Sequence, residues 1–332
     1  MDLQNDPNLQ VNTNAITARM TQKEKTQQII LARNNFQSPH GLVQFRYITK
    51  PKCITDQNGQ TLIYLEQLND NNVVTQATNA VNHYYFHTLK HPSHRSKEFW
   101  ENFIEHFGMY MLYNILPYTS SNMASSHNIE HQECVNNLLQ NLKPLSDSIN
   151  QFLHNYYRSL YEKLSKLRWG PFAPKSFGVF PMIAINYNTI SDYHWDEHDE
   201  LNSFCCLVAL GDFEGGELCF PQLQIVILLK LNQVIAFSSR LLLYGNFPII
   251  RGICHSIVYF VHRTFFHHTR NFTPYDEAKV VRKESRSIVS MIPHQDLTDV
   301  QGLNCRVRLS VAKKSQIEIP KKTSDKRRGK AS

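Results

Sequence analysis

A series of short β-type segments fills the second half of the chain and limits the folds that it can adopt. The segments are rich in branched and aromatic residues, and Asn, Asp, Gly or Pro separates each from the next. No helical periodicity lies between them. Short strands that follow one another without helices predict an antiparallel sandwich or barrel, and they exclude a parallel doubly wound sheet. The expected strands are 180–188, 204–210, 217–220, 223–229, 234–237, 241–244 and 256–261.

The first half of the chain predicts a helical flank with a few short strands. Apolar residues recur at helical spacing over 97–118 and over 135–167, where Pro144 is expected to divide the pattern into two helices. A short helix is expected at 21–34 and strands at 41–48 and 61–65. The expected organisation is a disordered polar lead-in at 1–40, a helical and short-strand flank at 41–170, a β-core at 171–270, an extension at 271–305 and a basic disordered tail at 306–332.

Charge is concentrated at the C-terminal end. The 332 residues carry a net charge of +7, of which the segment 306–332 alone supplies +8. Basic clusters of this kind are typical of nucleic-acid contacts and nuclear-localisation signals, and also of solvated ends. The polar N-terminus predicts no secretory signal, and no apolar run approaches the roughly 20 residues of a membrane span. Seven cysteines without a CxxC pair indicate an intracellular, reducing compartment.

The densest group of metal-capable side chains is the sequence SDYHWDEHDE at 191–200. In an extended segment, side chains two residues apart point to the same side, so His194 and Asp196 can converge on one ion. One imidazole and one carboxylate supply two corners of the facial triad that non-haem Fe(II) oxygenases use. A third protein ligand must then come from a distant strand.

The same residues also fit a zinc-peptidase pattern. His194 to His198 reads H-x-x-E-H. That chemistry requires a helix, which places the two histidines on one face with the Glu as base. The flanking segments are β-like, which argues against the zinc-peptidase interpretation.

Downstream motifs complete an ordered set. They are GDFEGGELCF at 211–220, VIAFSS at 234–239, LLLYGNFP at 241–248 and GICHSIVYF at 252–260. With the His-x-Asp segment, this order resembles the double-stranded β-helix Fe(II)/2-oxoglutarate dioxygenases, and among them the fungal relatives of the TET/JBP nucleic-acid base oxygenases. Prolyl hydroxylases share some of these features more distantly. The resemblance covers 177–268 and implies a jelly-roll core that binds Fe(II) and 2-oxoglutarate.

Two positions depart from the family that the chain resembles. Tyr244 stands where the family has its second metal-binding histidine, and a phenol, with a pKa of about 10, must lose its proton to bind iron well. Cys254 stands at the position of the Arg or Lys that pairs with the far carboxylate of 2-oxoglutarate, two residues before the retained Ser256. The resemblance also makes Tyr187 a possible cosubstrate contact, with a core position as the alternative.

The resemblance therefore implies metal ligands His194, Asp196 and, at the distal histidine position, Tyr244. It implies a cosubstrate site at Cys254 and Ser256. His255 follows Cys254 and is expected to face away from the metal, while Arg251 is expected outside the barrel. Two hypotheses follow: a hydroxylase of nucleic-acid bases with weakened or lost activity, and a non-catalytic module of the same fold that binds nucleic acid or protein, in part through 306–332.

Overall fold

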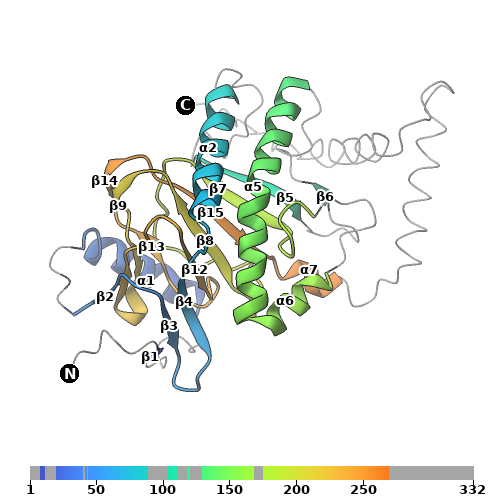
Figure 1. Ribbon diagram of the computed structural model, residues 1–332. Helices are drawn as coiled ribbons and strands as arrows, with labels where there is room; N and C mark the ends of the chain where they lie inside the picture. The colour runs from blue at the N-terminus through green and yellow to red at the C-terminus, as the bar shows by residue number, and fades with distance from the viewer. Residues whose placement is uncertain are drawn as a thin grey trace, which may run out of the picture. The chain divides into compact units, whose positions relative to one another are not determined.

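We describe the fold from a computed structural model (Figure 1). It describes residues 8–11, 20–39, 42, 44–88, 103–110, 118–119, 129–167 and 175–268. The predicted extension at 271–305 and basic tail at 306–332 lie outside these residues. Of the expected lead-in at 1–40, the described residues form β1 (Asn8–Gln10) and the helix α1 (Gln22–Asn35), which agrees with the helix expected at 21–34.

A large sheet forms the centre of the described part of the chain, with nine strands in the order β1-β3-β4-β12-β8-β15-β7-β5-β6. Its central strands are all antiparallel to their neighbours, as the sequence predicted. The strands after β1 are β3 (Lys52–Thr55), β4 (Thr61–Gln67), β12 (Gln233–Phe237), β8 (Cys205–Leu210), β15 (His255–Phe260), β7 (Met182–Asn186), β5 (Ile104–Tyr110) and β6 (Tyr118–Thr119).

A smaller sheet faces the large one, and a two-strand ribbon accompanies it. The smaller sheet has the order β13 (Gly245–Asn246), β10 (Leu218–Phe220), β11 (Ile225–Ile227) and β2 (Arg46–Ile48), with a 3-10 turn at Pro221–Leu223. The ribbon pairs β14 (Ile249–Gly252) with β9 (Phe213–Gly215). The sequence did not predict this ribbon, because both strands are short and carry glycines.

Side chains from the two main sheets meet in one apolar cluster. Leu207 and Phe237 of the large sheet share this cluster with Phe220 and Ile225 of the smaller sheet. Strand β8 is apolar throughout because both of its faces are buried. Cys205 and Leu207 face the interior between the sheets, while Cys206 and Val208 face the helices. Two facing sheets, antiparallel except where β1 joins β3 and β2 joins β11 in parallel, share one core and form the expected double-stranded β-helix.

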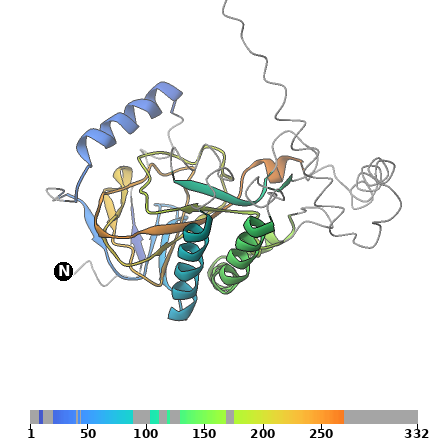
Figure 2. The same ribbon diagram turned by 90° about the horizontal axis from the view of Figure 1, so that it is seen from above.

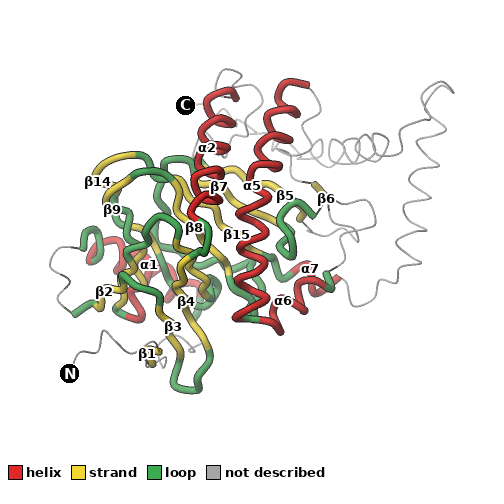
Figure 3. The backbone as a smooth tube through the Cα atoms, in the orientation of Figure 1, coloured by secondary structure: helices red, strands yellow, loops and turns green. Residues whose placement is uncertain are grey.

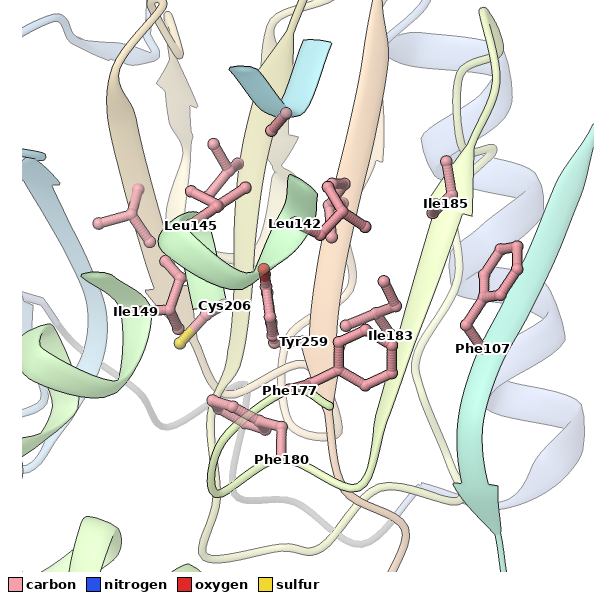
Figure 4. Packing of buried hydrophobic residues seen from close by; sticks show 14 of the residues in the cluster. Phe107, Leu142, Leu145, Ile149, Phe177, Phe180, Ile183, Ile185, Cys206 and Tyr259 are labelled. Carbon is pink, nitrogen blue, oxygen red and sulfur yellow. The ribbon is translucent and has the colours of Figure 1, made fainter. Parts of the chain in front are cut away.

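Two helices, α2 (Asn71–Thr88) and α5 (Ile129–Tyr156), cover the outer face of the large sheet, followed by α6 (Arg158–Ser165). Figure 3 shows these helices beside the strands, and Figure 4 shows Leu142, Leu145 and Ile149 of α5 packed against Tyr259 and Ile183 of the sheet. A short helix, α7 (Thr264–His268), follows the last strand. None of the described helices has the length and apolar character that a membrane span needs.

Helix α1 lies on the other side of the sheets from α2 and α5 (Figure 2). Its buried Ala32 packs with Val226 of β11 and Trp195. A capping box begins the helix, because the Thr21 side chain accepts a hydrogen bond from the Glu24 amide and the Glu24 side chain bonds the Thr21 amide. The fold therefore has four layers: helices, large sheet, small sheet and α1.

The helix expected at 97–118 is wrong over the described residues, which form strand β5 instead. Phe103 and Phe107 are four residues apart, a spacing that fits a helix as well as the same face of a strand. Pairing with β7 decides between them, since Phe107 lies opposite Ile183 at the sheet edge. Gly108 allows β5 to lie this close to the backbone at Pro181, because its φ is +125° and a Cβ there would lie 2.2 Å from the Pro181 carbonyl oxygen.

Three further expectations differ from the structure. Helix α5 continues through Pro144, and the break falls at Tyr157 instead. The predicted strand at 241–244 is a turn, of which Tyr244 alone forms an isolated bridge with His194. The sequence interpretation also missed α2, where polar residues alternate with the small apolar residues that pack on α5.

Candidate metal centre

Backbone pairing brings His194 beside Tyr244, 50 residues later in the chain. The His194 amide donates to the Tyr244 carbonyl at 3.0 Å, and the Tyr244 amide donates to the His194 carbonyl at 3.1 Å. The two rings lie 4.4 Å apart between centroids. The segment is extended at His194 and turns at Glu197 and His198, so it does not form the helix that a zinc peptidase requires.

The three residues expected to bind metal meet through hydrogen bonds. The Tyr244 hydroxyl donates to Asp196 Oδ2 at 2.7 Å, while Asp196 Oδ1 lies 3.5 Å from His194 Nε2. The other His194 nitrogen, Nδ1, is 2.6 Å from the carbonyl oxygen of Asp192. The His194 and Asp196 side chains are 39% and 30% exposed, so solvent reaches both, whereas Tyr244 is only 5% exposed.

The electrostatics of the group favour a neutral phenol beside a carboxylate. Burial alone would raise the pKa of Asp196, but hydrogen bonds from His194, Tyr244 and Ser239 lower it below its usual range. Burial would likewise lower the pKa of His194, but Asp196 and Asp192 raise it. Burial and the Asp196 charge raise the pKa of Tyr244 well above that of a free phenol. Tyr244 therefore acts as a hydrogen-bond donor.

These residues fit only part of an Fe(II) centre. His194 and Asp196 are suitable donors on one accessible side, but Tyr244 keeps its proton and directs it at a ligand oxygen. Across the described ranges, no group of three His, Cys, Asp or Glu side chains has the spacing of a metal site. Tyr244, which the resemblance placed at the third ligand position, is a protonated hydrogen-bond donor to Asp196 here.

A pocket is lined by residues of β7, β8, β9, β10, β13 and β15 and of the loops near them, and His194, Asp196 and Tyr244 are not among its lining residues. Cys254 and Ser256 both line it, and Asn186 Nδ2 donates to Ser256 Oγ at 2.8 Å. The lining residues are Asn186, Thr189, Ile190, Ser191, Leu207, Ala209, Phe213, Gly216, Leu218, Leu229, Asn246, Cys254 and Ser256. Among these described residues there is no Lys, Arg or His, and burial raises the pKa of the Cys254 thiol to about 12.

Arg251 does not supply the missing cation. Its guanidinium pairs with Glu214 at 2.6 Å on the ribbon, and its side chain is 76% exposed. A dicarboxylate in the pocket would leave its far carboxylate without a charged partner, which costs free energy in a partly buried site. The pocket therefore does not fit 2-oxoglutarate in the way that the family resemblance implied.

Tyr187, for which a cosubstrate contact and a core position were both considered, is not among the residues that line this pocket. Its ring stacks between Tyr85 of α2, at 3.9 Å, and His255, at 4.6 Å between centroids. Successive residues of a strand face opposite sides, so Asn186 faces the pocket and Tyr187 faces the helices. The core alternative for Tyr187 is the one that the packing supports.

His255 also faces the helices, as the sequence predicted. Its Nδ1 accepts from the Asn188 amide at 3.0 Å, and its Nε2 lies 2.9 Å from Asn82 Oδ1. The ring is fully buried, and burial lowers its pKa to about 4. His255 is thus a neutral structural residue.

Burial of neutral His255 makes the protein sensitive to acid. Its pKa lies below that of the unfolded chain, about 6.5, so its contribution is complete above pH 6.5 and is lost as the pH falls toward 4. We expect the free energy of unfolding to fall by about 2 kcal/mol between pH 7.5 and pH 5 from this residue. Urea unfolding at both pH values checks this. His255→Gln should reduce the loss and His154→Gln, at an exposed site, should not; an equal loss in both variants would contradict the assignment.

The sequence analysis missed the contacts that hold the 192–197 segment in place. Lys25 of α1 pairs with Glu197 at 2.9 Å, and Arg33 pairs with Asp192 at 2.8 Å. The Tyr193 hydroxyl donates to the Phe36 carbonyl at 2.7 Å. The partners of each pair are more than 150 residues apart, so no local pattern could have indicated them.

The strand order and the shared core define a double-stranded β-helix, as the sequence predicted. No protein-family model matches the chain, and no curated protein matches it. Solved structures that are similar in fold include NgTET1 in complex with 5mC DNA, with a TM-score of 0.49 and 15% identity over 80% of this chain and 100% of that one.

Two other similar structures have lower TM-scores. A 2OG-Fe(II) oxygenase family oxidoreductase from Burkholderia pseudomallei has a TM-score of 0.29 and 19% identity over 48% of this chain and 68% of its own. The viral collagen prolyl hydroxylase of Paramecium Bursaria Chlorella virus-1 has a TM-score of 0.34 and 14% identity, over 60% and 88%. These likenesses concern the fold alone.

Proposed function

We propose that this chain is an Fe(II)/2-oxoglutarate dioxygenase-like protein whose oxygenase reaction is weakened or lost. By the sequence resemblance, the parent reaction is hydroxylation of nucleic-acid bases. The observation that carries the proposal is the 2.7 Å hydrogen bond from the Tyr244 hydroxyl to Asp196. A metal-binding imidazole would offer a lone pair at this position, whereas the phenol donates a proton to a residue that the metal needs as a ligand.

The pocket supports the same proposal independently. An Arg at position 254 would grip a carboxylate through two parallel hydrogen bonds. The thiol of Cys254 carries no charge, because burial raises its pKa to about 12. Loss of a charged hydrogen bond costs about 1.5–3 kcal/mol, which corresponds to roughly tenfold to several-hundredfold weaker cosubstrate binding.

A non-catalytic binding role on the same fold is the natural alternative use of such a site. Nucleic acid is the proposed partner, since the resembled family acts on it and the segment 306–332 carries a net charge of +8. Nuclear localisation is proposed on the same basic segment. Both remain predictions from sequence, because that segment lies outside the described residues.

Titration of 2-oxoglutarate into the anaerobic, Fe(II)-loaded chain tests the proposal. Chelation of 2-oxoglutarate by Fe(II) produces a visible charge-transfer band. We expect no band for the wild-type chain up to low millimolar cosubstrate. Tyr244 does not replace the third histidine ligand, and Cys254 does not replace the cation that binds the carboxylate. A band at micromolar concentrations, followed by succinate formation in air, would contradict the proposal.

A further inference from the structure

Both oxygens of the Asp196 carboxylate face partners within the protein. Oδ2 accepts the Tyr244 hydroxyl at 2.7 Å, and Oδ1 lies 3.5 Å from His194 Nε2. His194 is held from its other side by the Asp192 carbonyl, 2.6 Å from Nδ1. One lone pair that a metal ion would use, on Asp196 Oδ2, is therefore taken by the Tyr244 hydroxyl proton.

Tyr244 is placed rigidly enough to maintain this arrangement. Its ring packs edge-on against Phe237, with centroids 4.7 Å apart, and it is 5% exposed. The paired amides of His194 and Tyr244 fix the two backbones at 3.0 and 3.1 Å. A side chain ordered by its packing loses little conformational entropy when it forms a hydrogen bond.

We propose that Tyr244 takes the place of the metal ion at this site: its backbone pairs with His194 and its hydroxyl binds Asp196, so that these contacts hold the 194–196 segment and the site takes up no divalent cation. The inference rests on the proposed function only in placing the former metal site at these residues. It goes further, because it states that Tyr244 holds the 194–196 segment in place and that this segment needs no bound metal.

Binding of Co(II) to the full-length chain tests this inference without 2-oxoglutarate. Visible Co(II) absorption and the shift of the melting temperature on adding the ion report binding, and EDTA reverses both. We expect neither signal for the wild-type chain. Tyr244→His should bind Co(II) at least about a hundredfold more tightly than wild type, and adding His194→Ala to it should remove the gain, because three protein donors are then needed for the site.

Tyr244→Phe provides a second variant that keeps the packing and deletes only the hydroxyl. It releases Asp196 Oδ2, so we expect Co(II) binding about tenfold tighter than wild type, through His194 and Asp196 alone. Tyr259→Phe is the matched control: its side chain is also buried and loses a hydrogen bond, of 3.1 Å, but to Ser146 of α5. Its Co(II) response should equal that of wild type.

Two results would overturn the inference. One is Co(II) binding by the wild-type chain that His194→Ala abolishes. The other is no gain in either Tyr244 variant when circular dichroism shows both folded. Wild-type chain that binds Co(II) but forms no 2-oxoglutarate complex would remove this inference and leave the proposed function intact, so the two can fail separately.

Discussion

Tyr244→His combined with Cys254→Arg is expected to form the visible Fe(II)/2-oxoglutarate complex that we expect to be absent from the wild-type chain. The His supplies a neutral imidazole beside His194 and Asp196, which the structure already brings together. The Arg places a guanidinium in the pocket that Ser256 lines, where the described residues supply no cation. The Arg alone should strengthen cosubstrate binding by tenfold to several-hundredfold, from about 1.5–3 kcal/mol.

Single variants separate the two contributions. Tyr244→His alone should bind Fe(II) but hold 2-oxoglutarate weakly, and Cys254→Arg alone should form no complex because Tyr244 still occupies the metal site. Cys206→Arg is unsuitable as a control because that residue is buried in the core. Ser38→Arg, outside the pocket lining, adds the same charge and should change nothing. A folded double variant without a band or succinate would show that the positional assignment is wrong.

Phe237→Ala is expected to lower the free energy of unfolding by about 3–5 kcal/mol. Phe237 is fully buried at the centre of the cluster between the two sheets. Its ring contacts Phe220 at 5.2 Å and Tyr244 at 4.7 Å between centroids, so truncation leaves a cavity that both sheets line. Two facing sheets cannot close over such a cavity without a shift of β12, which is paired on both sides.

Urea unfolding measures this loss, with Phe86→Ala as the matched control. Phe86 has the same side chain but is 64% exposed on α2, so its truncation should change the free energy of unfolding by no more than about 0.5 kcal/mol. The slope of the transition should stay the same in both variants. A loss below about 1 kcal/mol for Phe237→Ala would mean that the sheets do not share a core at this point.

Most of the β-core could be predicted because its strands carry the signal locally. In β8 and β12 nearly every residue is apolar and branched or small, since one face packs on helices and the other on the opposite sheet. The ordered motifs around His194 and Asp196 indicated the double-stranded β-helix through their resemblance to a known family. They are contiguous stretches whose spacing does not depend on the rest of the chain.

The errors fall where a local pattern had two solutions. The spacing of Phe103 and Phe107 fits a helix and a strand, and only pairing with β7 selects the strand. Pro144 was expected to break a helix, but packing of Leu142 and Leu145 against the sheet keeps α5 continuous. The free energy of burying these side chains exceeds that of the hydrogen bond which the proline cannot donate.

By itself, the sequence determined the class of fold, the His-x-Asp segment and the two departures at Tyr244 and Cys254. Only the tertiary structure decided which groups these side chains contact. It placed the Tyr244 hydroxyl on Asp196, stacked Tyr187 between Tyr85 and His255, and fixed the 192–197 segment through α1. The physical reason is range: residue type and periodicity act over a few positions, whereas each of these contacts joins residues at least 48 positions apart, which only the folded chain brings together.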